Sequence, residues 1–209
     1  MKTKILLAFI VMSFLWGCTS TMKYTWTKVD YEGRKFNKIL VVVMSATVQG
    51  RTIAENTMVD MFAKKGITAT NSLTVFPPDE NALELSEDEI QERILSGNYD
   101  GVLITKLIDA SAREVREGGD SYYQPVTYRY RRSIRTGYMY MQEPEYYRQE
   151  ESYVVESQLF DVAEEATRES VVWSGQSTLT DPSSFESAAE TYSKTLVKTL
   201  LKSGKIVVN

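Results

Sequence analysis

The sequence predicts an α/β fold in which helices pack on a single mixed β-sheet. The run Ile39–Val43 consists only of Ile, Leu and Val, which is typical of a central strand covered on both faces. Strand-like and helix-like segments then alternate twice, as in βαβ units with parallel strands and right-handed crossovers. The later strand-like segments follow one another without a helix, so those strands should pair antiparallel and make the sheet mixed.

A first helix is expected after the Ile39–Val43 strand. Thr52 and Glu55 have the spacing of a capping box, and Gly66 supplies a C-terminal stop. Between these signals the apolar residues recur at helical spacing: Ile53, Met58, Met61 and Phe62. The segment Ile67–Val75 is the next expected strand.

A second helix carries the same signals. Ser86 and Glu89 form a capping box, and Gly97 closes the helix. The apolar stripe between them comprises Ile90, Ile94 and Leu95. A third strand is then expected to start at Gly101 and to reach towards Val115.

The C-terminal part is expected to hold two strands and one helix. Val154–Val162 and Ser170–Leu179 have strand patterns. Ser183 and Glu186 should cap a helix that ends at Gly204, with a buried stripe of Phe185, Ala189, Tyr192, Leu196 and Leu200. Ile206–Val208 would add a short edge strand. The expected order of elements is β-α-β-α-β-β-β-α.

The composition excludes several kinds of catalytic and metal site. The chain has 209 residues, no histidine and one cysteine. A Ser-His-Asp triad, a Cys-His pair, a His-ligated metal, an internal disulfide and a Cys-rich metal site are therefore all excluded. We expect no enzyme activity, no metal and no organic cofactor, although a Ser-Lys dyad or a calcium ion held by carboxylates stays open.

The N-terminal segment has the pattern of an export signal. Lys2 and Lys4 precede the charge-free run Ile5–Leu15, which is too short to span a bilayer as a helix. Leu15-Trp16-Gly17-Cys18 resembles the signal of bacterial lipoproteins, although a small residue is usual where Trp16 stands. The resemblance implies cleavage before Cys18, a diacylglyceryl thioether on its sulfur and a fatty acyl chain, such as palmitate, on its amine. The alternative is an ordinary signal peptide with an incidental cysteine.

The expected domain organisation follows from these patterns. Residues 1–17 are the signal peptide, and residues 18–36 are polar and aperiodic, as in a tether. Residues 37–209 form the α/β domain, with a Tyr/Arg-rich hairpin insertion at about 117–150.

The insertion holds the candidate binding residues. Residues 122–148 contain eight of the 13 tyrosines and five arginines. Alternation over Thr127–Arg135 would place Tyr128, Tyr130 and Ile134 on one face and Arg129, Arg131 and Arg135 on the other, and Gly137 could turn the chain. The candidate binding residues are Tyr128, Arg129, Tyr130, Arg131, Arg132, Arg135, Tyr138 and Tyr140.

Two interpretations of the insertion stay open. Guanidinium groups stack on rings and grip carboxylates or phosphates in pairs of hydrogen bonds, and tyrosines supply contact area at low entropic cost. The segment would then be a recognition surface for a partner or an anionic polymer. Alternatively, it is a solubilised hairpin whose arginines pair with its acids, which are Glu143, Glu145, Glu150 and Glu151.

The order of elements and two short motifs carry a family resemblance. Leu159-Phe160-Asp161 is followed by Val172-Trp173-Ser174-Gly175, a strand, a turn and a Trp-Ser-Gly strand. With the lipoprotein signal, this resembles the envelope lipoproteins related to the amino-terminal domain of TolB, including the curli-secretion lipoprotein and several uncharacterised lipoprotein families. The resemblance covers roughly residues 37–203.

The resemblance implies a function in the bacterial cell envelope. The first expectation is a non-catalytic lipoprotein that serves as a scaffold or assembly factor, on the periplasmic side of the outer membrane. The alternatives are a binder of peptidoglycan or lipopolysaccharide through the Tyr/Arg segment, and a subunit of an oligomeric secretion pore. The expected partners are the membrane, reached through the lipid anchor, and an envelope protein or peptidoglycan. An oligomer is possible, and nucleic acid is not expected because the chain carries an export signal.

Overall fold

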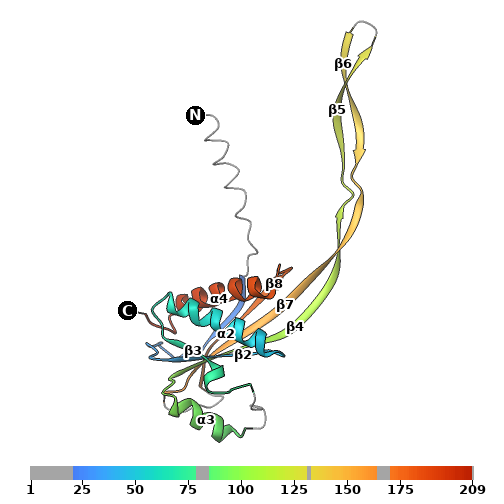
Figure 1. Ribbon diagram of the computed structural model, residues 1–209. Helices are drawn as coiled ribbons and strands as arrows, with labels where there is room; N and C mark the ends of the chain where they lie inside the picture. The colour runs from blue at the N-terminus through green and yellow to red at the C-terminus, as the bar shows by residue number, and fades with distance from the viewer. Residues whose placement is uncertain (1–20, 79–84, 131–132, 164–169, 209) are drawn as a thin grey trace, which may run out of the picture. The chain divides into compact units, whose positions relative to one another are not determined.

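The structure is a computed structural model that describes residues 21–78, 85–130, 133–163 and 170–208. Its largest sheet is mixed and has six strands in the order β1-β8-β7-β4-β2-β3, with helices packed on it (Figure 1). This confirms the predicted fold class. The elements are β1 (Thr21–Thr27), β2 (Ile39–Met44), α2 (Val48–Ala63), β3 (Ala69–Asn71), the 3-10 helix η1 (Ser72–Thr74), α3 (Glu87–Ser96), β4 (Gly101–Gly118), β5 (Ser121–Tyr130), β6 (Ser133–Gln142), β7 (Glu145–Asp161), β8 (Val171–Thr180) and α4 (Phe185–Lys202).

The chain divides into two compact units. The first, called the α/β domain below, comprises the described residues up to Ala110 and from Ser152 onward. The second, called the ribbon, comprises Ser111–Glu151 and contains β5, β6 and the outer halves of β4 and β7.

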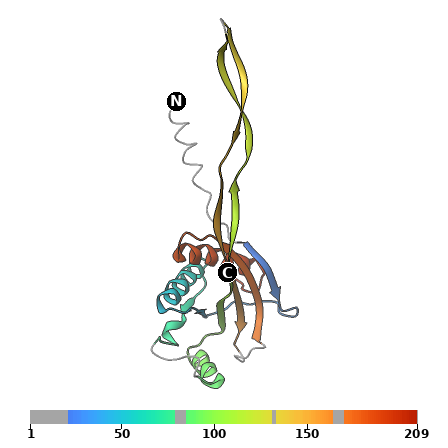
Figure 2. The same cartoon turned by 90° about the vertical axis from the view of Figure 1, so that its right-hand side faces the viewer.

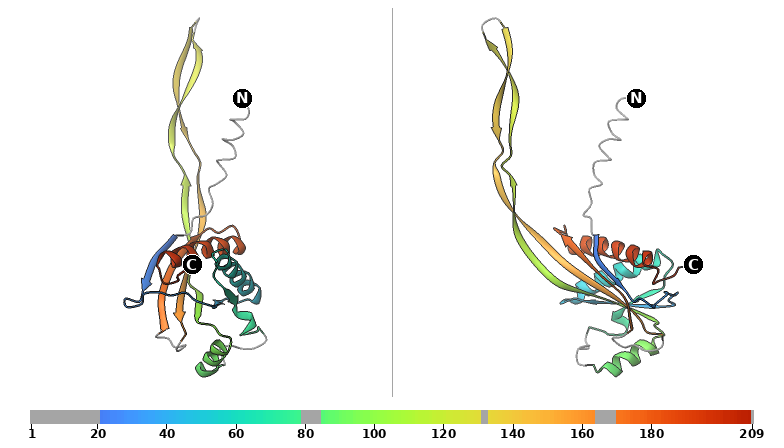
Figure 3. Two further views of the ribbon diagram at one scale, coloured as in Figure 1. Left: turned by 90° about the vertical axis from the view of Figure 1, so that its left-hand side faces the viewer. Right: turned by 180° about the vertical axis from the view of Figure 1, so that it is seen from behind.

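Strand β2 is the centre of the α/β domain. It pairs in parallel with both β3 and β4, which confirms the expected βαβ units. Ile39, Leu40 and Val41 are fully buried. Ile39 and Val41 pack into the cluster beneath α2 and α4, whereas Leu40 packs into the cluster beneath α3. The two faces of β2 are therefore covered by different helices, as predicted (Figure 3).

Helix α2 begins earlier than the sequence indicated. Its N-cap is Thr47, whose hydroxyl oxygen accepts a hydrogen bond from the Gly50 amide at 3.1 Å. The predicted capping box is wrong, because Thr52 lies inside the helix and donates to the Val48 carbonyl, and Glu55 is fully buried.

The other two helices agree better with the sequence. The capping box of Ser86 and Glu89 at the start of α3 is confirmed in both directions. Helix α4 is capped by Ser184 rather than Ser183, which moves Phe185 to the first helical position and leaves it 49% exposed. The rest of its predicted stripe is buried, namely Ala189, Tyr192, Leu196 and Leu200.

The N-terminal segment is a second correction. Thr21–Thr27, expected to lie in a tether, forms β1 and pairs antiparallel with β8 at the edge of the sheet (Figure 2). Its threonines, Tyr24 and Trp26 favour strands, but the mixed charge of the surrounding residues obscured that pattern. At the other terminus, Ile206 makes one parallel bridge with Arg34 and no longer strand is formed among the described residues there.

Candidate functional site

The ribbon is built by an antiparallel pair of ten-residue strands. β5 and β6 pair without a break from Ser121 opposite Gln142 to Tyr130 opposite Ser133. The chain therefore reverses between Tyr130 and Ser133 and not at Gly137, which pairs with Val126 inside the ribbon. The expected single strand over Thr127–Arg135 is wrong, so the predicted division of its residues into an aromatic and a basic face loses the continuous strand on which it was based.

The register shows where the candidate residues meet. Tyr128 pairs with Arg135, and Arg129 pairs with Ile134. Arg131, Arg132 and the side chains of residues 128–135 lie outside the described part of the structure. Side chains alternate between two faces along one strand, but this alternation does not continue unchanged through a turn into the next strand. The faces could have been predicted correctly only if the position of the turn had been known.

The described tyrosines of β5 and β6 are exposed. The side chains of Tyr138 and Tyr123 are 74% and 70% exposed, and those of Tyr122 and Tyr140 are about half exposed. The rings of Tyr123 and Tyr140 lie opposite each other, edge to face, with centroids 5.7 Å apart. Cross-strand aromatic pairs of this kind stabilise a two-stranded sheet, and their outer surfaces stay open to contact.

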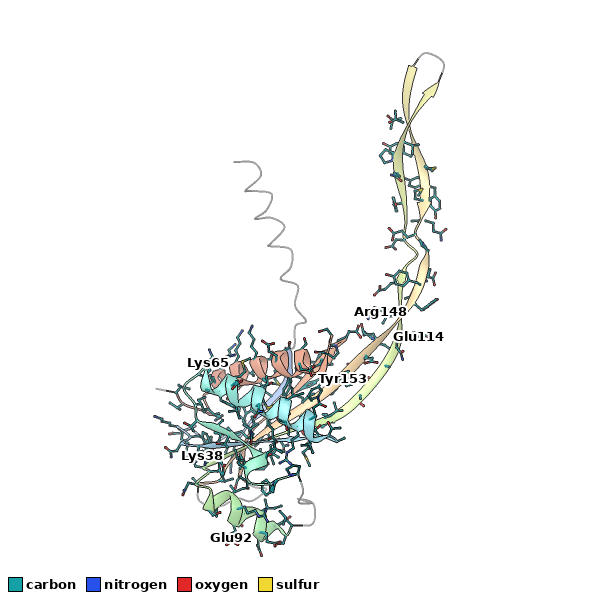
Figure 4. All side chains as sticks on the ribbon, viewed as in Figure 1. Lys38, Lys65, Glu92, Glu114, Arg148 and Tyr153 are labelled. Carbon is teal, nitrogen blue, oxygen red and sulfur yellow. The ribbon has the colours of Figure 1, made fainter. Side chains whose placement is uncertain are left out.

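The other end of the ribbon is held by ion pairs between β4 and β7, one of which involves Arg148, labelled in Figure 4. Arg148 pairs with Glu117 at 2.7 Å, and Arg113 pairs with Glu150 at 2.6 Å. The Tyr146 hydroxyl also donates to Glu117, which raises the pKa of Tyr146. At this end the second interpretation holds in part, because the Arg148 charge is balanced by acids of the ribbon.

Charge is therefore separated along the ribbon. Residues 121–142 contain four arginines and no acid, whereas residues 143–151 contain four glutamates and one arginine. Gly118 and Gly119, both with positive φ, mark the boundary between the two parts. A Cβ on Gly118 would lie 2.4 Å from the Pro144 carbonyl oxygen, so only glycine fits this joint.

An ionic cluster that the sequence reasoning missed ties residues 31–38 to the sheet. The Arg34 guanidinium donates two hydrogen bonds to Asp161, at 2.6 and 2.7 Å, and one to Asp100 at 3.1 Å. Asp100 also accepts from the amides of Asn37 and Lys38. Arg34 lay in the expected tether, so no pattern in the sequence linked it to the two acids.

The electrostatics of the Arg34 cluster favour charged carboxylates. Burial would raise the pKa of Asp161, but hydrogen bonds from Arg34 and Tyr31 outweigh burial and lower it. Burial would likewise raise the pKa of Asp100, and the amides of Asn37 and Lys38, together with Arg34, lower it. The Arg34 guanidinium thus bridges two carboxylates that also accept hydrogen bonds from Tyr31, Asn37 and Lys38, which is the arrangement of a structural ionic link.

A second missed residue is Glu55, which is fully buried on α2. Its carboxylate accepts from the Val43 amide, the Ser72 amide and hydroxyl, and the Arg51 guanidinium. These bonds end β3 at Asn71 and turn the chain into η1, where the sequence predicted a strand to Val75. Glu55 is thus a structural link between β2, α2 and η1.

Several expectations fall on parts of the chain that the structure does not describe or does not test. Cys18 and the signal peptide lie outside the described residues. Among the described residues, no group of three or more Cys, Asp or Glu side chains is arranged to hold a metal ion. No described helix is both long and apolar enough to cross a membrane.

Comparison with known proteins gives similarity only at the level of solved structures. No protein-family model matches the chain, and no curated protein matches it. A PelC dodecamer from Paraburkholderia phytofirmans is 18% identical, with a TM-score of 0.45, over 91% of this chain and 100% of that chain. A point variant of that PelC dodecamer is 19% identical, with a TM-score of 0.42, over 86% of this chain and 95% of that chain.

A third solved structure shares less of its own length. A PDZ domain protein from Parabacteroides distasonis is 10% identical, with a TM-score of 0.34, over 94% of this chain and 39% of that chain. The resemblance to the TolB amino-terminal domain stays a prediction.

Proposed function

We propose that the protein is a non-catalytic envelope lipoprotein, anchored through Cys18, that serves as a scaffold or assembly factor. Residues 121–142 are its partner-binding surface. The observation that carries this proposal is the exposure of four tyrosines, Tyr122, Tyr123, Tyr138 and Tyr140, on two paired strands. The absence of histidine from the chain supports the non-catalytic part.

The exposed tyrosine rings of β5 and β6 offer a contact surface. None of the described side chains of residues 121–142 belongs to the two buried clusters of the α/β domain, so the rings of Tyr122, Tyr123, Tyr138 and Tyr140 do not serve its core. Grouped exposed aromatic side chains mark interaction sites, and tyrosine is enriched where binding energy is concentrated. Tyrosine has only two side-chain torsions, so these rings lose little conformational entropy on binding.

The charge of the same residues favours an anionic partner. Residues 121–142 contain four arginines and no acid in the sequence, and guanidinium groups attract carboxylates or phosphates, which peptidoglycan and lipopolysaccharide both carry. Binding of such an envelope ligand is therefore our second candidate function. The same charges disfavour the pore alternative, because each arginine placed in the lipid core costs about 2.5–3.5 kcal/mol or more.

Site-specific photocrosslinking in cells tests the first candidate. A photoreactive amino acid at Tyr123, Tyr138 or Tyr140 should give a discrete crosslinked species, whereas the same group at the exposed Lys65, beyond α2, should not. Crosslinks from Lys65 alone, or none from any ribbon position, would contradict the proposal.

Matched charge variants test the second candidate. Arg129→Gln/Arg131→Gln/Arg135→Gln removes three charges from residues 121–142. Arg113→Gln/Arg116→Gln/Arg148→Gln removes three from the ion-paired end. Pull-down on sacculi and on lipopolysaccharide should be lost in the first variant, kept in the second and weakened by salt in the wild type. Equal retention of both variants would exclude an electrostatic ligand at residues 129–135.

A further inference from the structure

The second face of the main sheet is only partly covered. Helices α2 and α4 lie on one face, and α3 covers the other face over β2 and β4 (Figures 1 and 3). Over β1 and β8, no helix among the described residues covers the α3 side of the sheet. Here Tyr24 pairs with Gln176 and Trp26 pairs with Ser174, so these four side chains share one face.

This open face has a polar floor and two exposed rings. Tyr24, Thr25, Trp26, Ser174 and Gln176 line a shallow groove of about 360 Å³. Ser174 and Gln176 donate to Glu156, and Glu156 pairs with Lys106 at 3.1 Å. The polar side chains of the floor thus bond to neighbouring side chains of the sheet. The surface available for contact is that of Tyr24 and Trp26, which are 71% and 51% exposed.

The position of β1 in the chain indicates what covers these rings. β1 begins at Thr21, three residues after Cys18. A fully extended chain of six residues spans at most about 21 Å, so Tyr24 cannot lie farther than that from a lipidated Cys18. An anchor this close holds the edge strand beside the lipid headgroups.

The chemistry of the segment suits a lipid surface. Tryptophan and tyrosine concentrate at the membrane–water interface, where one end of the ring system is apolar and the other is hydrated. Residues 19–28 contain Lys23 and Lys28 and no acid, and basic residues near an anionic leaflet each contribute about 1 kcal/mol of attraction.

We propose that the face formed by Tyr24 and Trp26 is a second membrane contact, docked on the lipid surface that carries the anchor. The inference rests on the lipidation of Cys18 proposed above. The acyl chains hold the protein on the membrane, and the aromatic face fixes how the α/β domain is turned towards it.

The chain provides its own probe for this contact. After removal of residues 1–17, two tryptophans remain: Trp26, which is exposed, and Trp173, which is fully buried. The mature lipoprotein is reconstituted in vesicles of phosphatidylethanolamine and phosphatidylglycerol that contain a phospholipid brominated near the headgroup end of its acyl chains. The difference between wild type and Trp26→Phe isolates the emission of Trp26.

The expected result is that brominated lipid removes about half or more of the Trp26 emission, because rings at headgroup level come within reach of the bromines. The residual emission of Trp26→Phe should be unchanged. A control, Lys65→Trp in the Trp26→Phe background, places an exposed tryptophan near the helix-covered face and should not be quenched (Figure 4).

Three results would contradict the proposed membrane contact, each for a different reason. If mass spectrometry finds no lipid on Cys18, the anchor and this inference both fail. If Cys18 is lipidated but Trp26 stays unquenched by brominated lipid and open to acrylamide, only the docking fails. Protection from acrylamide without bromine quenching, increasing with protein density, would overturn the inference in favour of contact with a second copy.

Discussion

Loss of Arg34 should show how much more a partly buried ion pair contributes to stability than an exposed one. Arg34 holds Asp161 and Asp100 in one cluster, and its side chain is 30% exposed. Arg34→Met should lower the free energy of unfolding by about 1–3 kcal/mol, because two partly buried carboxylates lose their counter-charge. Arg113→Met, which breaks the exposed pair with Glu150, should cost less than about 1 kcal/mol. Urea unfolding of both variants measures this, and equal losses would contradict the account.

The same cluster predicts a pH dependence. The pKa values of Asp100 and Asp161 are lowered in the folded protein, so their stabilisation is present above the unfolded pKa of about 3.9. This stabilisation is lost as the pH falls through the pKa values that the two carboxyl groups have in the folded protein. The difference in unfolding free energy between wild type and Arg34→Met should therefore narrow on acidification below about pH 4. A difference that stays constant from neutral pH to pH 2 would show that the charges are not its source.

Glu55 should tolerate substitution poorly even by its closest analogue. The Val43 amide donates to one carboxylate oxygen of Glu55 and the Ser72 amide donates to the other, so the NH₂ group of Glu55→Gln must face one of these two donors; the substitution also leaves the Arg51 charge without its partner. We expect a loss of about 2–4 kcal/mol in unfolding free energy. Asp60→Asn, on the exposed side of the same helix, is the control and should cost under about 0.5 kcal/mol. A Glu55→Gln melting temperature equal to that of wild type would contradict this role.

Among the elements, β2 sets the stability of the α/β domain. Val41→Asp would bury an unpaired charge in the cluster beneath α2 and α4, and should cost several kcal/mol, enough to abolish folding. Met44→Asp, at the exposed end of the same strand, is its matched control and should fold normally. Circular dichroism and export level report the outcome. A Val41→Asp protein that melts like Met44→Asp would show that β2 is not central.

The sequence predicted best those elements whose signals are local. The aliphatic run of β2 and the capping box of α3 combine short-range patterns with burial, and both were confirmed. Glu55 was predicted to belong to a capping box because it lies three residues after Thr52. Its buried carboxylate instead bonds to donors that are distant in the sequence, and the spacing alone does not distinguish the two cases. β1 pairs with β8 near the other end of the chain, and the Arg34 cluster joins residues 66 and 127 positions apart, so no local pattern encodes either feature.

The location of the candidate site in the chain could be predicted from composition, but the arrangement of its residues could not. Clustering of tyrosine and arginine located the ribbon, and the structure confirms that Tyr138 and Tyr140 are exposed. The turn between Tyr130 and Ser133 could not be located, because neither glycine nor Asn-Gly marks it. Lipidation of Cys18 and contacts of residues 128–135 stay predictions.

At the scale of the whole molecule, we propose that the α/β domain supplies the fold and that residues 121–142 supply the binding. The Glu143 amide donates to the Asp120 carbonyl at 2.9 Å, so the chain is already closed beneath this segment. Replacing residues 121–142 by Asn-Gly, the preferred two-residue hairpin turn, should therefore leave the α/β domain intact. The shortened protein should be expressed and melt as wild type does.

The most direct test is complementation of a deletion strain by this shortened protein, with wild-type protein and the Arg113→Gln/Arg116→Gln/Arg148→Gln variant as controls. We predict that both controls restore the cellular phenotype and that the shortened protein, present at normal level and folded, does not. Full complementation by the shortened protein would show that residues 121–142 are dispensable. Unfolding of the shortened protein would show that the segment is structural, and either result would contradict the account.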